Sequence, residues 1–527
     1  MATPSRTAPP RTAPSSRTAP PRPAPTAPGV APATAPPRHG DPLDPTDPRG
    51  LLATCVRAAD RARRTGRPTL AAWAAPLPGV DPLALWGRAR LHTPRALLWR
   101  SAWDQGSLIA LGTAHDLRGH GADRVRTVRE EWTRLARDLV AGGTGDDALG
   151  TGEGPLAVGG FAFAPDRGAS PGRLPDTLMW VPALQIRSLE PTPEAPRAPG
   201  HAELRLNAVL SPGDDPERAA ERLAALAAAC LPAEADPASE PPAAPPSPAA
   251  RTHTCAELPA AEDWKRLVRD ATDGMRAGAF EKVVLARELR VTASRPFDVP
   301  RAVRRLREAN PATTLFAVDH DGRTFLGATP EYLVRVDGPT VHALGLAGTT
   351  PRGATPEQDE AHERELVDSA KIRHEHEVVV RMLRRALADS CAEVDAETPP
   401  RVVKLATVQH LSTKVRGRLS GDSPTGVLDF VECLHPTPAL GGHPRAQALD
   451  WLDRNEGLDR SWYAGAVGWA DHRGQGQFAV AIRSALLDGA TASLYAGCGL
   501  VADSDPQTEY EETCAKLQAM TSALEIE

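Results

Sequence analysis

The chain has 527 residues, of which 41% are hydrophobic, so it exceeds one average domain and can bury a sizeable core. Its 61 basic and 67 acidic residues give a formal net charge of −6, which excludes the broad positive field on which nucleic-acid binding relies. Seven widely separated cysteines argue against a disulfide framework or a zinc knuckle, and no apolar run approaches membrane-spanning length. We therefore expect a cytoplasmic protein that contacts neither nucleic acid nor a membrane.

Two segments are too rich in proline and alanine for regular structure. Residues 1–48 consist mainly of Pro, Ala, Thr, Ser and Arg, and we predict a disordered tail because such a segment buries too little apolar surface to offset the ordering of its backbone. Residues 231–254 carry a second proline-rich run, which we interpret as a linker or long surface loop. These segments separate an N-terminal region over 49–230 from a region over 255–527.

The N-terminal region combines helical and strand-like patterns. Residues 123–139 have a helical pattern, and residues 156–163 read as a strand. The glycines between these stretches lack the Gly-Lys-Ser/Thr ending of a phosphate-binding loop, so we interpret them as an ordinary loop.

A strand that carries a lysine is predicted near the start of the second region. Residues 280–291 alternate between apolar and other side chains, which places Lys282 on the face opposite Val283, beside Val284 and Ala286. A lysine that is desolvated by small apolar neighbours has a lowered pKa and can act as a general base. A solvated lysine near a strand end fits the same pattern, so the sequence permits the catalytic role without requiring it.

Glu331 follows a break between two short predicted strands. Proline cannot donate to a sheet ladder, so the strand pattern is interrupted across 327–330. A carboxylate at an irregular point in an apolar sheet is open to functional use, but an edge glutamate facing water fits equally well. After a further strand over 341–346, the glycine-rich residues 347–353 are predicted to form a turn that can present backbone N–H groups to an anion.

A long helix is predicted from Thr355, which acts as its cap, with Gln358 closing a capping box. Asp368, Ile372, Glu375 and Val379 share one face of this helix at spacings of four, three and four. An ionised carboxylate between branched apolar side chains is costly to bury unless a cation or a paired donor neutralises it.

The last predicted helix opens at Asp505 and carries Glu509, Glu512 and Lys516 on one face. A surface salt bridge between Glu512 and Lys516 is the simplest interpretation of this spacing. The functional alternative is a carboxylate ligand for a hard cation with a lysine nearby for an anionic substrate.

Several ordered blocks in the second region carry a family resemblance: KVVLAR at 282–287, LGATPE at 326–331, LAGT at 346–349, RHEHE at 373–377, LHPTPALGGHP at 434–444, YAGAVGW at 463–469, AIR at 481–483 and YAGCG at 495–499. With these blocks in this order, the stretch from Leu258 to Glu527 closely resembles the chorismate-utilising enzymes, and among them the isochorismate synthases of siderophore and menaquinone pathways. The N-terminal region matches far more loosely, but the resemblance implies that residues 49–230 form the N-terminal part of the same fold and that residues 255–527 form its chorismate-binding catalytic region.

The resemblance sharpens the α+β pattern of strands and long helices into a specific fold and reaction. It implies two large antiparallel β-sheets packed together and flanked by helices, and a Mg²⁺-dependent isomerisation in which water adds to carbon 2 of chorismate and the 4-hydroxyl leaves. It also implies that Lys282 is the general base, Glu331 the general acid, and Glu375 and Glu512 the Mg²⁺ ligands, with Glu509 close by. The other matched positions are implied to line the substrate: Gly348, Thr349, His410, Ala439, Arg483, Gly497 and Lys516.

Related activities are weighed against this expectation. Aminodeoxychorismate synthases place a lysine where Ala347 stands, and anthranilate synthases usually lack a lysine at the position of Lys282, so both are disfavoured. Salicylate synthase is the alternative to isochorismate synthase, because salicylate synthases share the lysine base and its acidic partner and then eliminate pyruvate. A catalytically impaired chorismate-binding protein is the second alternative, because family members usually carry an acidic residue where Ile372 stands. Pathway and oligomeric state do not follow from the sequence.

Overall fold

A computed structural model describes most of the chain from residue 48 onward. The described residues are 48–77, 80–104, 106–143, 154–165, 173–188, 202–231, 252–405, 408–421 and 425–526. The predicted tail over 1–48 lies outside them except for its last residue, and so does the predicted linker over 231–254 except for its ends. No helix within the described ranges is long and apolar enough to cross a membrane.

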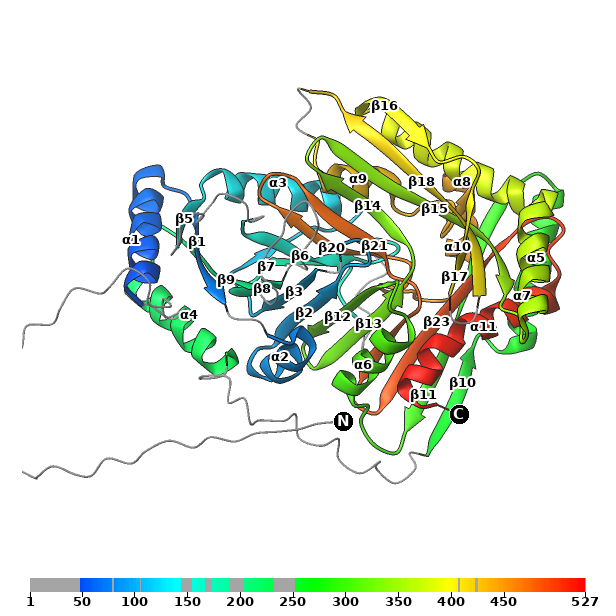
Figure 1. Ribbon diagram of the computed structural model, residues 1–527, viewed down its shortest axis with the longest axis horizontal. Helices are drawn as coiled ribbons and strands as arrows, with labels where there is room; N and C mark the ends of the chain where they lie inside the picture. The colour runs from blue at the N-terminus through cyan, green and yellow to red at the C-terminus, as the bar shows by residue number, and fades with distance from the viewer. Residues whose placement is uncertain are drawn as a thin grey trace, which may run out of the picture. The chain divides into compact units, whose positions relative to one another are not determined.

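Two large sheets organise the described residues (Figure 1). The first has thirteen strands, in the order β10 (His253–Leu258), β11 (Lys282–Ala293), β23 (Thr491–Leu500), β22 (Ser484–Asp488), β13 (Arg323–Thr329), β12 (Thr314–His320), β2 (Arg95–Arg100), β3 (Ser107–Leu111), β8 (Leu184–Ser188), β9 (Ala202–Leu210), β1 (Thr69–Leu77) and β5 (Val140–Gly143), with β19 (Gly442–His443) paired on β11.

The second sheet has ten strands. Their order is β16 (Cys391–Ala396), β18 (Val408–Leu419), β15 (Thr340–Pro351), β14 (Tyr332–Asp337), β21 (Gly476–Val480), β20 (Ala466–Asp471), β6 (Leu156–Phe161), β7 (Thr177–Val181) and β4 (His115–Leu117), with β17 (Arg401–Lys404) paired on β18. The described pairings in both sheets are antiparallel except β1 with β5, which is parallel, so the expected antiparallel fold is confirmed apart from this edge.

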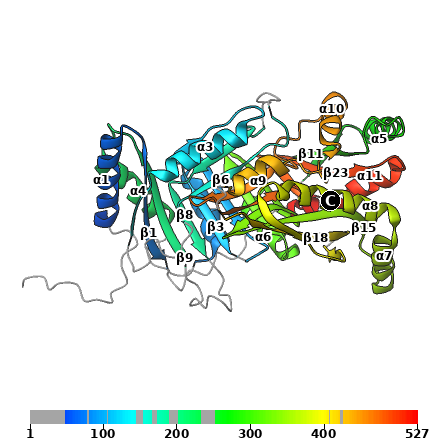
Figure 2. The same cartoon turned by 90° about the horizontal axis from the view of Figure 1, so that it is seen from above.

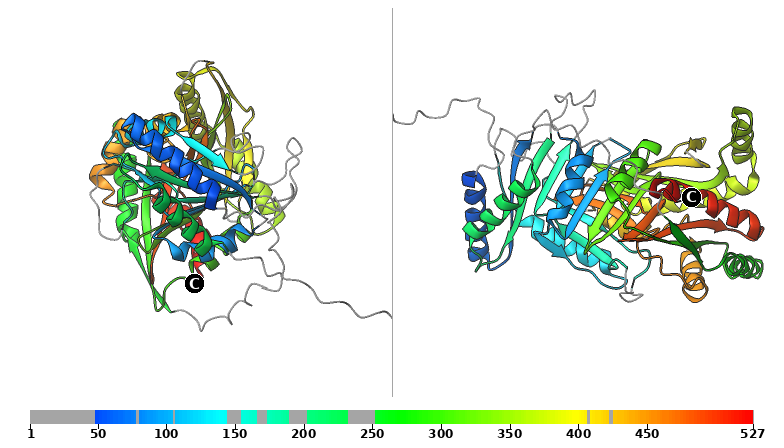
Figure 3. Two further views of the ribbon diagram at one scale, coloured as in Figure 1. Left: turned by 90° about the vertical axis from the view of Figure 1, so that its left-hand side faces the viewer. Right: turned by 90° about the horizontal axis from the view of Figure 1, so that it is seen from below.

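An apolar core fills the space between the sheets. Leu97 and Phe316 from the first sheet join Val158 and Val467 from the second in one buried cluster. A second cluster packs the other face of the first sheet against α1 (Pro48–Thr65), α2 (Pro82–Ala89), α4 (Pro216–Cys230), α6 (Val299–Ala309) and α11 (Pro506–Leu524). Figure 3 shows α1 (blue) and α4 (green) next to each other beside β1 and β9.

The remaining helices cover the second sheet and one end of the first. Helices α3 (Arg124–Arg137), α8 (Ala370–Ala388) and α9 (Val427–Leu434) share a third cluster with strands of the second sheet. The others are η1 (Arg90–His92), α5 (Ala261–Arg276), α7 (Pro356–Asp368) and α10 (Arg445–Asn455). Figure 2 shows α8 with β15 of the second sheet lying close to α11 with β23 of the first, and this junction holds the candidate site.

Two local predictions are corrected by the structure. The single helix predicted from Thr355 is wrong, because the chain leaves the helical conformation at Ser369 (ψ 116°) and restarts as α8. Asp368 is therefore the last residue of α7 and does not share a helix with Ile372, Glu375 and Val379. The turn predicted over 347–353 is largely strand, since β15 continues to Pro351 and only shifts register at Gly348, whose φ of +78° favours glycine.

Candidate active site

A cavity of about 300 Å³ lies where the two sheets meet α8 and α11. Every site residue predicted from the sequence lines this cavity: Lys282, Glu331, Gly348, Thr349, Glu375, His410, Ala439, Arg483, Gly497, Glu509, Glu512 and Lys516. Residues up to 234 positions apart in the chain therefore converge at one place, from Lys282 to Lys516. The cavity establishes their neighbourhood, and their individual roles stay predictions.

Lys282 begins β11 and points its side chain into the cavity wall. The residue is 6% exposed, and its Nζ lies 4.0 Å from Oε2 of Glu375. A Cβ atom at Gly499 on the neighbouring strand would lie 3.2 Å from the same Nζ, so glycine leaves the room that the lysine occupies. The lysine is thus held between β23 and α8, away from bulk water.

Glu331 stands where the chain crosses from one sheet to the other, between β13 and β14. Its N–H donates to Thr329 Oγ1 (3.2 Å), and the residue is 4% exposed. Burial raises the pKa of Glu331 to about 8, although the positive charges of Arg483, Lys516 and Lys282 lower it in part. The carboxyl group is therefore mainly protonated at neutral pH, which is the state that a general acid requires.

Arg483 and His410 form a polar wall of the cavity. Nη2 of Arg483 lies 3.4 Å from Nε2 of His410, and Nδ1 of His410 lies 3.2 Å from Gly348 O and 3.1 Å from Thr349 Oγ1. Burial, together with the Arg483 charge, holds the pKa of His410 well below its usual value, so the imidazole is neutral. Because a guanidinium only donates, Nε2 accepts and the proton resides on Nδ1, where it can be donated to Gly348 O.

The acidic side of the cavity comes from α8 and α11. Lys516 Nζ contacts Glu512 Oε1 at 2.5 Å and donates to Gly497 O at 2.9 Å. Glu375 from α8 and the buried Glu509 from α11 line the same cavity.

A magnesium ion fits this donor set if the substrate completes it. Within the described ranges no three His, Cys, Asp or Glu side chains lie close enough together to hold a metal by themselves. Mg²⁺ takes oxygen ligands, keeps several waters and often uses only one or two protein carboxylates together with substrate oxygens. Glu375 and Glu512, with Glu509 nearby, therefore suit an ion shared with an anionic substrate rather than an all-protein cage.

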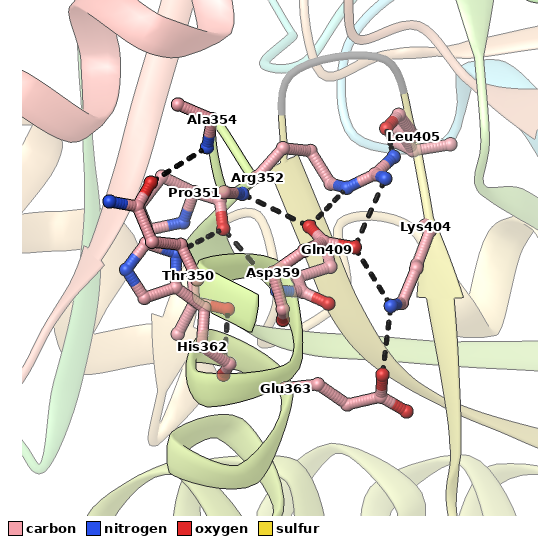
Figure 4. A network of polar contacts seen from close by, with 12 residues as sticks. Thr350, Pro351, Arg352, Ala354, Asp359, His362, Glu363, Lys404, Leu405 and Gln409 are labelled. Carbon is pink, nitrogen blue, oxygen red and sulfur yellow. Dashed lines mark hydrogen bonds and ion pairs between the residues drawn. The ribbon is translucent and has the colours of Figure 1, made fainter. Parts of the chain in front are cut away.

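A polar network fixes the backbone that follows the Gly348–Thr349 segment (Figure 4). Arg352 donates to both carboxylate oxygens of Asp359 (Nε to Oδ1 2.6 Å, Nη2 to Oδ2 3.1 Å), and Lys404 Nζ lies 2.9 Å from Oδ2. Asp359 Oδ1 also accepts the N–H of Gly353 (3.0 Å). The end of β15 is thereby tied to α7 and β17.

Tyr463 is a cavity residue that the sequence does not identify by itself. It stacks on Tyr495, with ring centroids 5.4 Å apart, and a Cβ atom at Gly497 would lie 3.2 Å from its hydroxyl. The block at 463–469 marks this stretch of chain, but only the folded strands show which of its side chains reaches the cavity.

Three cationic side chains, a protonated carboxyl group and several carboxylates around one small cavity are the features of an enzyme that acts on a small anionic molecule. Residues 56–525 match the protein family described as "Chorismate binding enzyme". The chain belongs to this family.

Similar proteins agree with the match. The chain is 34% identical to isochorismate synthase MenF of Bacillus subtilis over 479 residues, which cover 89% of this chain and 96% of that protein. It is 36% identical to the salicylate biosynthesis isochorismate synthase of Pseudomonas aeruginosa over 484 residues, 90% of this chain and 94% of that protein. The structure of MenF, the menaquinone-specific isochorismate synthase of Escherichia coli, shares the fold with a TM-score of 0.69 at 24% identity, covering 89% of this chain and 100% of that one. The resemblance and the fold class predicted from the sequence are confirmed.

Proposed function

We propose that this enzyme isomerises chorismate to isochorismate. The observation that carries the proposal is the presence in one cavity of the buried Lys282 and of Glu331, whose pKa is raised to about 8. An isomerisation by exchange of one hydroxyl group needs a base for the entering water and an acid for the departing hydroxyl. The names of the two relatives that match over most of both chains support the same activity.

Proton movements can be assigned to the two residues. Lys282, in its neutral amine form, takes a proton from the water whose oxygen bonds to carbon 2, the ring double bonds shift, and Glu331 gives its proton to the 4-hydroxyl, which leaves as water. One water enters and one leaves, and the loss of a proton from Lys282 to solvent and the gain of one by Glu331 restore both groups, so the reaction is balanced without a redox partner. Burial of both groups favours efficient proton transfer, because bulk water does not compete at either atom.

The remaining residues would bind and orient the substrate. Arg483 suits one carboxylate of chorismate because a guanidinium can bond to it through two nitrogens. Glu375 and Glu512, with Glu509 close by, are the residues that we propose to hold Mg²⁺, which when bound would neutralise the charge on the ring carboxylate.

Turnover of chorismate by the purified protein tests the proposal. With Mg²⁺ present, we expect isochorismate as the product and no release of pyruvate. Salicylate together with pyruvate would identify the alternative enzyme, salicylate synthase. Binding of chorismate without any product would identify a catalytically impaired binding protein. We also propose a cytoplasmic location, which the seven free cysteines support.

A further inference from the structure

Among the described residues, the outer edge of β11 has a strand partner only at its two ends. β10 pairs with residues 288–293 of β11, and β19 pairs with Lys282 and Val283. The edge groups of Val284 and Ala286 lie in the gap between these partners. The N–H of Val284 donates to Gly441 O (3.1 Å), but Val284 O and the N–H and C=O of Ala286 face no described strand on this edge. Because both residues are buried, these three groups need other hydrogen-bond partners.

A buried ion pair fills most of this gap. Arg460 donates to both carboxylate oxygens of Glu456 (Nε to Oε2 2.7 Å, Nη2 to Oε1 2.6 Å), and each side chain is 2% exposed. Nη2 of Arg460 also donates to Val284 O (2.5 Å), and Glu456 Oε1 accepts the N–H of Ala286 (2.8 Å). The indole N–H of Trp264 donates to Ala286 O (3.2 Å). At Val284 O and at both backbone groups of Ala286, side chains thus take the place of a strand partner.

The same pair reaches a second segment of the cavity wall. Nη1 of Arg460 donates to Leu440 O at 3.1 Å. Val284 and Leu440, the residues whose carbonyl groups Arg460 holds, line the cavity together with Lys282 and Ala439. The pair therefore lies directly behind the cavity wall and ties two of its segments to each other.

An apolar pair of the same size could not tie these two segments of the cavity wall together. Replacing a buried ion pair by well-packed apolar residues is often neutral or stabilising, so the charges are not needed for stability alone. Methyl and methylene groups, however, cannot bond to the carbonyl oxygens of Val284 and Leu440 or to the N–H of Ala286. The fork of the guanidinium, which donates in several directions within one plane, is suited to holding two carbonyl groups and a carboxylate together.

We infer that Glu456 and Arg460 are positioning residues, which set the place of Lys282 on β11 relative to Ala439 across the cavity. The inference rests on the proposed function, in which Lys282 acts on a water molecule beside the substrate. Displacement of a catalytic group by about 1 Å can lower a rate by roughly 100-fold, so the pair should affect the chemical step more than substrate binding.

Arg460→Lys tests the inference, because lysine keeps the charge beside Glu456 but one ammonium group cannot hold both carbonyl groups and both carboxylate oxygens. We expect kcat for isochorismate formation to fall by about 10–100-fold while KM for chorismate changes by less than about threefold. The matched control is Arg90→Lys, since Arg90 makes a similar two-point ion pair with Asp319 (2.8 and 2.6 Å) outside the cavity wall. The control should leave kcat unchanged.

The double variant Glu456→Gln/Arg460→Met guards against a folding defect in the first variant. It removes both charges, so no unpaired charge stays buried, but it loses the bonds to Val284 O and Leu440 O. Its kcat should also fall at least tenfold, measured per folded molecule by circular dichroism and active-site titration. Wild-type kcat in either folded variant, or a rise in KM alone, would overturn the inference. A wild-type enzyme that makes no isochorismate would overturn the proposed function instead, so the two failures are distinct.

Discussion

Burial raises the pKa of Glu331 to about 8, and this shift gives the enzyme a pH dependence that can be measured. The carboxyl group is protonated below this pKa and ionised above it, so kcat/KM, which reports the free enzyme, should fall on the alkaline side with an apparent pKa of about 8. Glu331→Gln should lower kcat by roughly 10²–10⁴-fold while chorismate still binds. A pH–rate profile of the wild type and chorismate titrations of the variant check both statements, and an alkaline limb that is absent would refute the acid role.

The same pKa shift affects stability with a defined sign. The folded protein binds the Glu331 proton more tightly than the unfolded chain, whose glutamate titrates near 4.5. The contribution of Glu331 to the free energy of unfolding is therefore greatest below pH 4.5 and is lost as the pH rises towards about 8. Melting curves of Glu331→Gln should lack this part of the pH dependence.

Lys282 can be tested through the origin of the new oxygen atom. Lys282→Ala should lower kcat by about 10²–10⁴-fold with chorismate binding retained, because the residue acts on a proton in flight. In the wild type, label from isotopic water should appear at carbon 2 of isochorismate. Label elsewhere, or unlabelled product, would contradict a base that acts on water. Lys265→Ala, at a half-buried lysine of α5 that pairs with Glu262 and does not line the cavity, is the control and should leave kcat unchanged.

Ile372 lies next to the proposed Mg²⁺ site. The residue lines the cavity with Glu375, and its Cγ2 lies 2.4 Å from where a Cβ atom of residue 348 would stand. Isoleucine cannot accept a hydrogen bond from metal-bound water, and such outer partners typically change metal affinity by about 10–100-fold. Ile372→Asp should therefore lower the Mg²⁺ concentration for half-maximal rate, whereas Glu375→Ala should remove metal-dependent activity. A normally folded Ile372→Asp with an unchanged Mg²⁺ titration would show that this position does not serve the ion; Ile372→Val is the size control.

For individual residues, the sequence predicts the side chains that line the cavity, but it does not predict the buried Glu456–Arg460 pair behind the cavity wall. Eight of the twelve predicted residues lie in short blocks that resemble a family and can be placed by their blocks, whereas His410 and the three residues of α11 lie outside the quoted blocks and are placed by the resemblance of the surrounding sequence. Glu456 and Arg460 look like an ordinary helical pair four residues apart, and nothing local distinguishes a buried pair from a surface one. Their burial depends on a gap between β10 and β19, which exists only once distant strands have paired.

For whole elements, the sequence predicts the start of a helix correctly where a capping side chain is followed directly by proline. The helix predicted from Asp505 is present as α11, with Asp505 accepting the N–H groups of Gln507 and Thr508. The break at Ser369 was missed, although Ser369 accepts the N–H of Ile372 as a helix cap (3.3 Å). Helices α7 and α8 both pack on β15 and β18 of the second sheet. The apolar spacing of a helix therefore continues across Ser369, and the sequence pattern does not show that a new helix begins there.

Asp359 joins three elements and offers a test of how the end of β15 is held (Figure 4). Hydrogen bonds from Arg352, Lys404 and the Gly353 N–H keep the pKa of Asp359 well below its usual value. The carboxylate therefore stabilises the fold above the ordinary aspartate pKa of 3.8, and this contribution is lost as the pH falls through the lowered value.

Asp359→Ala should release the segment after Thr349 and raise KM for chorismate severalfold with a smaller effect on kcat, because this segment borders the substrate rather than the reacting protons. Glu363→Ala removes only the more exposed partner of Lys404 and is the matched control. Steady-state kinetics and melting curves of both variants give the comparison. Equal effects of the two substitutions would show that Asp359 has no special role in holding β15.

In the whole molecule, the proline-rich segment over 231–254 is not a boundary between two separately folded domains. The sequence separates residues 49–230 from 255–527 by a proline-rich segment, yet β2 pairs with β12 over six residues of each strand in the first sheet, and β6 pairs with β20 in the second. Composition reveals a segment unfit for regular structure, but it does not reveal whether the flanking regions share a sheet. That information lies in long-range strand pairing, which a local pattern does not encode.

Residues 252–527 should consequently fail to fold alone, even though they contain the whole cavity lining. Without the N-terminal region, the inner edges of β12 and β20 would lose their strand partners, and the buried cluster around Phe316 and Val467 would lose one side of its packing. We expect insoluble material when this fragment is expressed by itself, and soluble, active enzyme when residues 48–231 are supplied with it.

A protease site introduced between residues 232 and 251 provides the matched control. After cleavage the two pieces should stay together on a sizing column and retain kcat, because paired strands rather than the connecting peptide join them. A soluble, active 252–527 fragment, or separation of the cleaved pieces with loss of activity, would mean that the two regions fold as independent units.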